Sequence, residues 1–354
     1  MRLLMFNLAT DTNDPILGFA TRWIAALAKQ VESIQVITMR AGRVDAPDNV
    51  RVYSAGKEKG YSEPRRAVEF YRHLLNVLRA NRIDVCFAHM IPIFTVLAAP
   101  LVKAMRIPIV TWHAHRQVTT LLKLAHCLSN RMVASAESAY RYKHDKLTVV
   151  GQGIDADLFI PNGSGPDHPP LILSVGRLSP IKDQLTLIQA VDLLRHEGLY
   201  VRCAFVGDSP TRDRAYAASV KHRVQELGLA SVVQFVGAVR HQEVVDWYRR
   251  SFAHVNLCPT GALDKAALEA MACCRPSVVS NEGFRSTLGE FSDQLVFRHK
   301  DAADLAAKLT RLLTISAGDR EWMGLGLRQR VVEAHGLEQL VRRLCVIFEE
   351  VRTR

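Results

Sequence analysis

The sequence lacks several features that would place it in other classes of protein. No run of uncharged apolar residues approaches the roughly 20 that span a bilayer, so we predict no membrane-spanning helix. The first 14 residues are a short apolar stretch broken by Asp11 and Asp14, which is not typical of a signal peptide. The seven cysteines are odd in number and have no paired spacing, as is typical of reduced thiols. We therefore expect a cytoplasmic protein.

The glycine fingerprint of dinucleotide-dependent oxidoreductases is also missing. That fingerprint needs three closely spaced glycines at the first strand-to-helix turn and an acidic residue about 20 positions later. The corresponding loop, residues 7–18, contains only Gly18, and Gly207 stands alone after a later strand. These absences argue against an oxidoreductase, and we predict no cofactor.

The sequence gives little evidence that the protein binds a metal ion or a nucleic acid. The adjacent Cys273 and Cys274 have no second cysteine or histidine pair at ligand spacing, so a zinc site is not expected. The chain is basic, with 46 lysine and arginine residues against 35 acidic ones and a formal charge of +11. It contains no recognised nucleic-acid-binding module, so we expect no nucleic acid partner.

What the sequence does contain is a long alternation of short β-rich and helical segments. At 354 residues the chain is too long for one ordinary core and fits two domains. The alternation predicts an α/β protein with parallel sheets built from strand-helix-strand units. We predict strands at residues 2–8, 33–39, 83–89, 107–112, 131–135 and 146–150, and then at 171–176, 201–207, 232–237, 253–257, 276–280 and 294–297.

A break in composition separates the two series of strands. Residues 160–170 contain four prolines and two glycines, through which no helix or strand can continue. We therefore predict a first domain at 1–160, a linker at 161–170 and a second domain at 171–336. The remaining residues, 337–354, are predicted to form a terminal helix.

The positive charge is concentrated in the first domain. Residues 51–146 hold 16 lysine and arginine residues against six acidic ones. Within them, Ser62 and Pro64 open a predicted helix on which Arg65, Arg72 and Arg79 recur every seven residues. One interpretation is a core-facing helix with a solvated basic side. The other is attraction to an acidic acceptor or to anionic lipid on the inner face of a membrane, where each basic residue contributes of order 1 kcal/mol.

The second domain carries a candidate site for a nucleotide diphosphate. Glu269 lies early on a predicted helix that follows a turn at residues 259–261. The start of such a helix presents free backbone N–H groups and a positive dipole, which suit a phosphate, and Glu269 one turn later can accept ribose hydroxyls. Upstream, Arg177 and Lys182 follow a strand and supply cations for the same phosphates.

With these motifs in place, the sequence resembles the GT-B glycosyltransferases of family 4. The motifs are GRLSPIK, FVGDSP, VVQFVGAV and LDKAALEAMACCRPSVVS, which lie between residues 176 and 280, and TWHAH and GQGID before them. The resemblance implies two Rossmann-like domains facing across a cleft, with the terminal helix crossing back to the first domain. It also implies a retaining glycosyltransferase that moves a sugar from a nucleotide-sugar donor to a glycan or lipid-linked acceptor, without a metal. Asp155 and Asp157 are spaced like a metal-binding pair, but they lie at the end of GQGID and two residues after it, where this family binds no metal.

The resemblance also assigns roles to individual residues. The family's sugar-contacting histidine corresponds to His113, and the catalytic set is completed by Arg177 and Lys182. His89 and His115 are candidate acceptor contacts, with a packed, hydrogen-bonded histidine as the alternative for His89. The predicted donor-binding residues are Gly18, Gly176, Val239, Leu263, Asp264, Lys265 and Glu269.

One departure from the family pattern concerns its paired glutamates. The family's first glutamate, which touches the donor sugar, corresponds to Gly261, whereas the second, which holds the ribose, is Glu269. Asp264 either replaces the missing sugar contact or caps the helix. Two alternatives stay open: a nucleotide-sugar epimerase, which could use the same phosphate cations, and a non-catalytic nucleotide-sugar-binding homologue, which Gly261 and the basic first domain favour.

Overall fold

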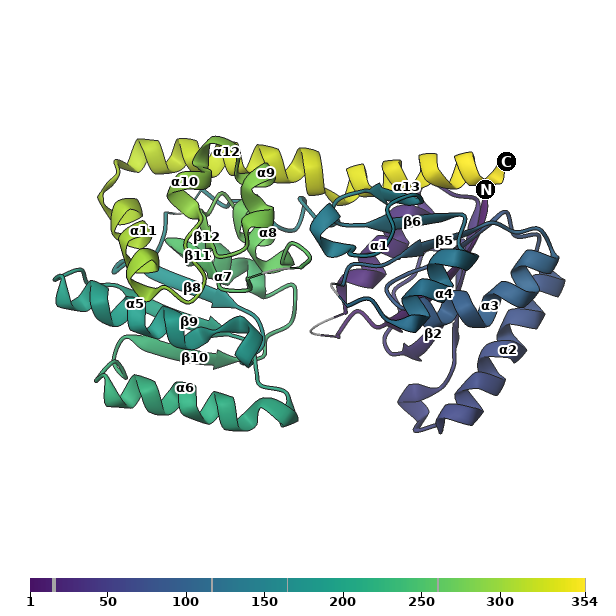
Figure 1. Cartoon of the computed structure of the whole chain (residues 1–354), viewed down its shortest axis with the longest axis horizontal. Helices are drawn as coiled ribbons and strands as arrows, with labels where there is room; N and C mark the ends of the chain where they lie inside the picture. The colour runs from purple at the N-terminus through teal and green to yellow at the C-terminus, as the bar shows by residue number, and fades with distance from the viewer. Residues whose placement is uncertain (15–16, 116, 164, 260, 354) are drawn as a thin grey trace. The chain divides into compact units, whose positions relative to one another are not determined.

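The computed structural model describes residues 1–14, 17–115, 117–163, 165–259 and 261–353. It divides the chain into two compact units, each an α/β layer structure (Figure 1). The first unit contains Met1–Gly153 and Leu337–Arg354, and the second contains Ile154–Gly336.

The first unit is built on a sheet of seven parallel strands. Their order across the sheet is β3-β2-β1-β4-β5-β6-β7. The strands are β1 (Arg2–Thr10), β2 (Ser33–Ala41), β3 (Val50–Ser54), β4 (Val85–Ala88), β5 (Ile109–Trp112), β6 (Arg131–Ala134) and β7 (Leu147–Val149). The helices are α1 (Phe19–Ala28), α2 (Glu63–Ala80), α3 (Pro92–Ala104), α4 (Thr120–Leu128) and α13 (Leu337–Arg352), with short 3-10 turns at Lys57–Lys59 and Glu137–Ala139.

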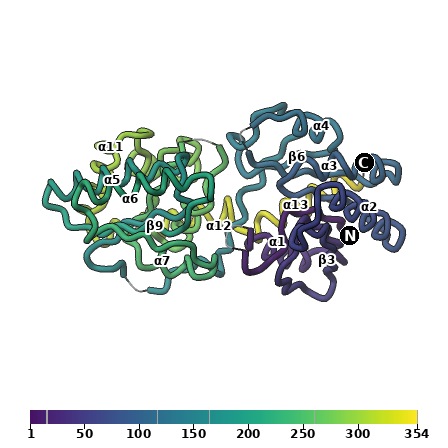
Figure 2. Tube along the Cα trace, turned by 90° about the horizontal axis from the view of Figure 1, so that it is seen from below, coloured from purple at the N-terminus to yellow at the C-terminus, as the bar shows by residue number. Residues whose placement is uncertain are grey.

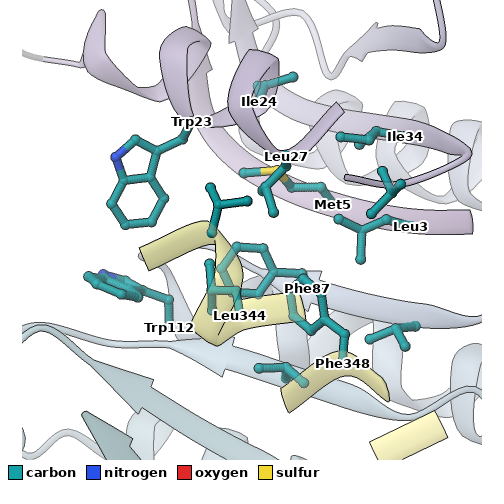
Figure 3. Close-up of a cluster of buried hydrophobic side chains, with 14 of the residues drawn as sticks. Leu3, Met5, Trp23, Ile24, Leu27, Ile34, Phe87, Trp112, Leu344 and Phe348 are labelled. Carbon is teal, nitrogen blue, oxygen red and sulfur yellow. The ribbon is translucent and has the colours of Figure 1, made fainter. Parts of the chain in front are cut away.

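Both faces of this sheet are buried, which explains the continuous apolar run in β1. Successive side chains of a strand point to opposite faces, so Leu3 and Met5 lie in one core cluster while Leu4 and Phe6 lie in another. Figure 3 shows the first cluster, in which Leu344 and Phe348 of α13 pack beside Phe87 and the side chains of β1 and α1. The second cluster is closed by apolar residues of α2 and α3.

The terminal helix is part of the first unit. Figures 1 and 2 show α13, coloured yellow, alongside α1, and five of its side chains have at most 4% of their surface exposed. These residues are Leu340, Val341, Leu344, Ile347 and Phe348. The helix therefore completes the core of a unit whose other residues, Met1–Gly153, lie far earlier in the sequence.

The second unit has a five-stranded parallel sheet in the order β10-β9-β8-β11-β12. The strands are β8 (Leu171–Val175), β9 (Arg202–Val206), β10 (Val233–Gly237), β11 (Ala253–Asn256) and β12 (Ser277–Val279). The main helices are α5 (Gln184–His196), α6 (Arg214–Glu226), α7 (Val244–Arg250), α8 (Lys265–Ala272), α11 (Ala302–Thr314) and α12 (Ala317–His335). Short helices are α9 (Arg285–Leu288) and α10 (Ser292–Leu295), with 3-10 turns at Pro180–Lys182, Thr211–Asp213, Glu282–Phe284 and Gly289–Phe291.

The strand order reverses direction once in each sheet. In the first unit the reversal lies between β1 and β4, and in the second it lies between β8 and β11. Open α/β sheets bind ligands outside the carboxyl ends of the strands at such a point. The topology therefore directs attention to the residues that follow these four strands.

Two predictions about strands are wrong. Residues 294–297 were predicted as a strand, but they run from the end of α10 into a segment that pairs with the sheet only through the bridge between Val279 and Val296. A short apolar run is buried in either structure, so its pattern does not separate them. Conversely, β3 at the edge of the first sheet was not predicted.

The boundary between the units also differs from the prediction. The structure places residues 154–170 in the second unit, not in the first domain or in a separate linker. The backbone N–H of Ile154 donates to the carbonyl of His335 at 2.7 Å, and Arg328 donates to the carbonyl of Phe159 at 2.7 Å. Asp167 accepts from Arg202 at 2.7 Å and from Arg250 at 2.9 Å. The proline-rich stretch is therefore held onto the second unit by these bonds.

Among the residues described, no helix has the length and apolar character needed to cross a membrane.

Candidate functional site

Several predicted site residues follow β8 and β11, at the strand-order reversal of the second sheet. Gly176 and Arg177 come directly after β8, and Lys182 ends the 3-10 turn that follows. Asn256 ends β11, and Asp264 precedes α8. The structure thus gathers Lys182 and Asp264, which are 82 positions apart, into one side-chain cluster.

The centre of this cluster is an ion pair between Lys182 and Asp264. The Lys182 ammonium donates to Asp264 Oδ2, and Asn256 Nδ2 donates to the same oxygen at 2.8 Å. The side chains of Lys182 and Asp264 have only 17% and 20% of their surfaces exposed. Lys182 is thus held by Asp264, whereas Arg177 is exposed.

The pKa values of the two partners follow from their contact. Burial alone would raise the pKa of Asp264, but the positive charge of Lys182 and the hydrogen bonds from Lys182 and Asn256 outweigh it and lower this pKa to about 2. Burial likewise works against the charged form of Lys182, but Asp264 raises the pKa of the ammonium. The pair is therefore fully ionised at neutral pH.

Asp264 also caps helix α8. Its Oδ1 accepts the backbone N–H of Ala266 at 3.4 Å, which satisfies one of the free N–H groups at the helix start. Of the flanking residues, Leu263 is 2% exposed, and burial lowers the pKa of Lys265 to about 7 although Glu269 opposes the shift. Asp264 thus caps α8 and forms the ion pair with Lys182 at the same time.

Glu269 is buried and already has two hydrogen-bond partners within the second unit. Its side chain is 8% exposed. Oε1 lies 2.9 Å from His241 Nε2, and Oε2 accepts from the hydroxyl of Tyr248 at 2.9 Å. Burial, and then the Glu269 carboxylate, raise the pKa of Tyr248, which keeps this hydroxyl protonated as a donor. A carboxylate has about four acceptor positions, so Glu269 retains capacity for a further donor.

The backbone is tightly packed at the ends of β8 and β9. Gly176 has φ +146°, and a Cβ at Gly207 would lie 2.2 Å from the Gly176 carbonyl oxygen. Only glycine at position 207 allows this approach. Val239, one of the predicted donor-binding residues, lies two residues after β10 and is half-buried.

In the first unit, His113 follows β5 and is 6% exposed. Its Nε2 lies 3.1 Å from the carbonyl oxygen of His115, whose own ring is exposed. Burial is the main reason why the pKa of His113 is lowered. The imidazole is therefore neutral at pH 7 and suited to hydrogen bonding rather than to supplying positive charge.

His89 and Gly18 have structural explanations. His89, which follows β4, is 1% exposed, its Nδ1 lies 3.3 Å from Asn7 Oδ1, and its ring packs 4.8 Å from that of Trp23. This is the packed histidine that the sequence left open. Gly18 is the N-cap of α1, and a Cβ there would lie 2.6 Å from the Asp14 carbonyl oxygen. The loop's own backbone therefore requires a glycine at this position.

A chain of polar side chains, which the sequence did not indicate, runs from the buried Tyr140 and His126 beside His113 to the exposed Asp145. The ring of Tyr140 lies 6.0 Å from that of His113 at a nearly perpendicular angle. His126 Nδ1 lies 2.7 Å from the Tyr140 hydroxyl, and its Nε2 lies 3.0 Å from Asp145. This chain fixes the wall against which His113 packs.

The second unit also contains site residues that sequence reasoning missed. Asn256, His241 and Tyr248 bind the carboxylates of Asp264 and Glu269. Asn256 could have been found, since a polar residue ending a buried parallel strand is a common site position. Nothing in the local pattern indicated His241 or Tyr248, because each meets Glu269 only through the fold.

Comparison with known proteins assigns the second unit. Residues 169–314, from the start of β8 through α11, match the family model described as "Glycosyl transferases group 1". The second unit thus carries the similarity to the group 1 glycosyl transferases. The match contains Arg177, Lys182, Asp264 and Glu269.

Curated relatives are similar over part of their length. The chain is 27% identical over 175 residues to the D-inositol 3-phosphate glycosyltransferase of Streptomyces scabiei, which covers 44% of this chain and 39% of that protein. It is 25% identical over 228 residues to the alpha-maltose-1-phosphate synthase of Mycolicibacterium smegmatis, which covers 58% and 57%. The chain thus spans about half or less of the length of these relatives.

Solved structures share the whole fold at low identity. HepE of Anabaena in complex with UDP is 15% identical with a TM-score of 0.79, covering 99% of this chain and 100% of that one. A glycosyltransferase of Rickettsia africae is 16% identical with a TM-score of 0.77, covering 99% and 98%. The predicted fold class of two Rossmann-like domains, as in GT-B glycosyltransferases, is therefore confirmed.

Proposed function

We propose that this protein is a retaining glycosyltransferase that moves a sugar from a nucleotide-diphosphate donor to a glycan or lipid-linked acceptor. The observation that carries the proposal is the group 1 family match, which spans the sheet at whose strand-order reversal Arg177 and Lys182 lie and the helix that carries Glu269. The proposal is further supported by HepE, a protein of the same fold whose structure was solved in complex with UDP.

The chemistry would use these residues as follows. The bond between the sugar's anomeric carbon and the diphosphate oxygen breaks, and the acceptor's hydroxyl oxygen forms a bond to the same carbon with retention of configuration. The hydroxyl proton leaves with the diphosphate or passes to solvent. Arg177 and Lys182 would stabilise the negative charge that develops on the leaving diphosphate, and such fixed charge accounts for a large share of catalysis in many enzymes. Glu269 would hold the ribose, and His113 would contact the sugar.

A ligand screen followed by a transfer assay tests this function. Nucleoside diphosphates at 100 times their dissociation constant should stabilise the protein by about 2.7 kcal/mol, which a thermal-shift measurement detects. The nucleotide-sugar of the stabilising base is then supplied with candidate glycan and lipid-linked acceptors. Stabilisation by none of UDP, GDP or ADP would contradict the proposal.

A second candidate function is a non-catalytic nucleotide-sugar-binding protein. Two observations favour it: Gly261 stands where the resembled family has its first glutamate, and Asp264 already pairs with Lys182. Such a protein would bind the donor but neither hydrolyse nor transfer its sugar. Conversion of the donor sugar without any acceptor would instead identify an epimerase.

We predict that sugar transfer persists in excess EDTA. Arg177 and Lys182, with the N-terminal end of α8, would supply the positive charge that a metal supplies in other phosphate sites. Initial rates measured in EDTA and after dialysis should match those in buffer. Loss of activity that magnesium or manganese restores would contradict the prediction and direct attention to Asp155 and Asp157.

We further propose peripheral binding to anionic membranes through α2. Arg65, Arg72 and Arg79 lie on the exposed side of this helix, whose other side is buried in the core. The Arg65 guanidinium stacks 3.6 Å from the ring of Tyr61, and Arg72 pairs with Glu69 at 2.5 Å. Two of the three arginines thus have partners within the first unit. Such local pairing is also expected if α2 is only a solvated basic helix.

Vesicle binding distinguishes the two interpretations of α2. Binding to vesicles that contain acidic lipid should fall steeply between 0.1 and 1 M salt, because the Debye length shrinks from about 10 Å to about 3 Å. Replacing Arg65, Arg72 and Arg79 by glutamine should remove most of the binding but leave donor hydrolysis unchanged. The matched control replaces the exposed Arg212, Arg214 and Lys221 of the second unit. Equal loss in both triple variants would indicate net charge alone, and no loss in either would support the solvated face.

A further inference from the structure

The ion pair described above sets a carboxylate beside a cation that the proposed donor site needs. Lys182 follows β8, and in the proposed function it binds the donor's diphosphate. Its ammonium, however, already contacts the Asp264 carboxylate, and both side chains are largely withdrawn from water. Charges interact more strongly there than on an open surface, so the carboxylate matters for any anion that approaches.

Asp264 is held in place by its surroundings. Besides Lys182, Asn256 binds its Oδ2 at 2.8 Å, and Oδ1 caps α8 through the N–H of Ala266. Lys182 in turn passes close to Gly176, where a Cβ would lie 3.2 Å from Lys182 Cε. Contacts from β11, from α8 and from the segment after β8 therefore fix the pair, and the carboxylate is not free to swing aside without breaking them.

We propose that Asp264 is a specificity determinant of the donor site, because its carboxylate occupies the anion position beside Lys182. This inference rests on the proposed function. The negative charge of Asp264 then repels a bound diphosphate and weakens its binding, whereas it does not repel an uncharged nucleoside. Asp264 thus reduces the advantage in affinity that a nucleoside diphosphate has over its nucleoside, and it favours donors whose sugar and base contacts contribute most of the binding.

Substitution is the way to remove this charge. Lys182 and the hydrogen bonds to Asp264 outweigh its burial and keep the pKa of the carboxyl at about 2, so it remains ionised at any pH suited to a binding experiment. Asp264→Asn keeps the shape of the side chain, and asparagine also caps helices well. The matched control is Asp301→Asn, because Asp301 caps α11 in the same unit by accepting the N–H of Asp304 at 2.9 Å.

The experiment measures calorimetric affinities of the full chain for UDP, GDP and ADP and for uridine, guanosine and adenosine. For the base that binds, Asp264→Asn should bind the diphosphate at least about 10-fold more tightly than wild type, because a like charge has been removed. Its affinity for the nucleoside should be unchanged, and Asp301→Asn should behave as wild type. The diphosphate should also raise the melting temperature more in Asp264→Asn than in wild type, because it replaces the lost partner of Lys182.

The outcomes separate this inference from the proposed function. Equal diphosphate affinity in wild type and Asp264→Asn overturns the inference but leaves a working donor site. Tighter binding of diphosphate and nucleoside alike overturns it too, since the change would then be one of shape. Diphosphate binding by neither protein overturns both the inference and the proposed function. If Asp264→Asn does not fold, Asp264→Ser takes its place, because serine is an equally good helix cap.

Discussion

Replacing Lys182 by methionine is expected to lower sugar transfer by about 100-fold or more and also to destabilise the second unit. The loss of transfer follows from removing one preorganised charge that stabilises the leaving diphosphate. The loss of stability follows from leaving the Asp264 carboxylate buried without its cation, which typically costs about 3–5 kcal/mol. Steady-state kinetics measure the first effect, and denaturant unfolding measures the second.

Two matched variants separate these effects. Arg177 is exposed, so Arg177→Ala should lower transfer by a similar factor with little change in the free energy of unfolding. The double variant Lys182→Met with Asp264→Asn removes both charges of the pair and should recover much of the stability but none of the transfer. If either single variant keeps more than about half of the wild-type turnover, its role at the diphosphate is wrong.

The fold could be predicted largely because both sheets are buried on two faces. Runs such as residues 3–6 and 171–173 are uninterrupted apolar sequence, which is typical of parallel strands between helices. The strand β3 was not predicted, because it lies at the edge of its sheet and its sequence, Val50–Ser54, contains only two aliphatic residues, both of them valines. Its strand conformation depends on pairing with β2, which is a tertiary contact.

The candidate site, like the fold, could be predicted from the sequence only where local features determine it. The positions of Arg177, Lys182 and Glu269 followed from strand ends and a helix start, which are local features. The partner of Lys182 did not, because Asp264 is 82 positions away and its alternatives as a cap or a ligand were equally compatible with the sequence. A buried carboxylate needs partners, so the apolar helix around Glu269 predicted that they exist, but only the fold identified His241 and Tyr248.

Replacing Glu269 by alanine is expected to lower the free energy of unfolding by about 2–5 kcal/mol. The Tyr248 hydroxyl is buried and would lose its acceptor, and an unsatisfied buried group costs about 1–3 kcal/mol. The partly buried His241 ring would lose its partner as well. Tyr248→Phe in the same background should recover part of the loss, because no hydroxyl is then left without a partner. Urea unfolding of the two single variants and the double variant measures this coupling.

Binding of nucleotides tests the second role of Glu269, that of holding the ribose. A hydrogen bond to a charged group contributes about 1.5–3 kcal/mol, so wild type should prefer the ribonucleoside diphosphate over its 2′,3′-dideoxy form by about 10-fold or more. Glu269→Gln preserves the volume and one acceptor oxygen for Tyr248 but loses the carboxylate, and we expect most of that preference to disappear. If Glu269→Gln keeps the full preference, Glu269 serves only to hold His241 and Tyr248. The ribose must then be held by another group.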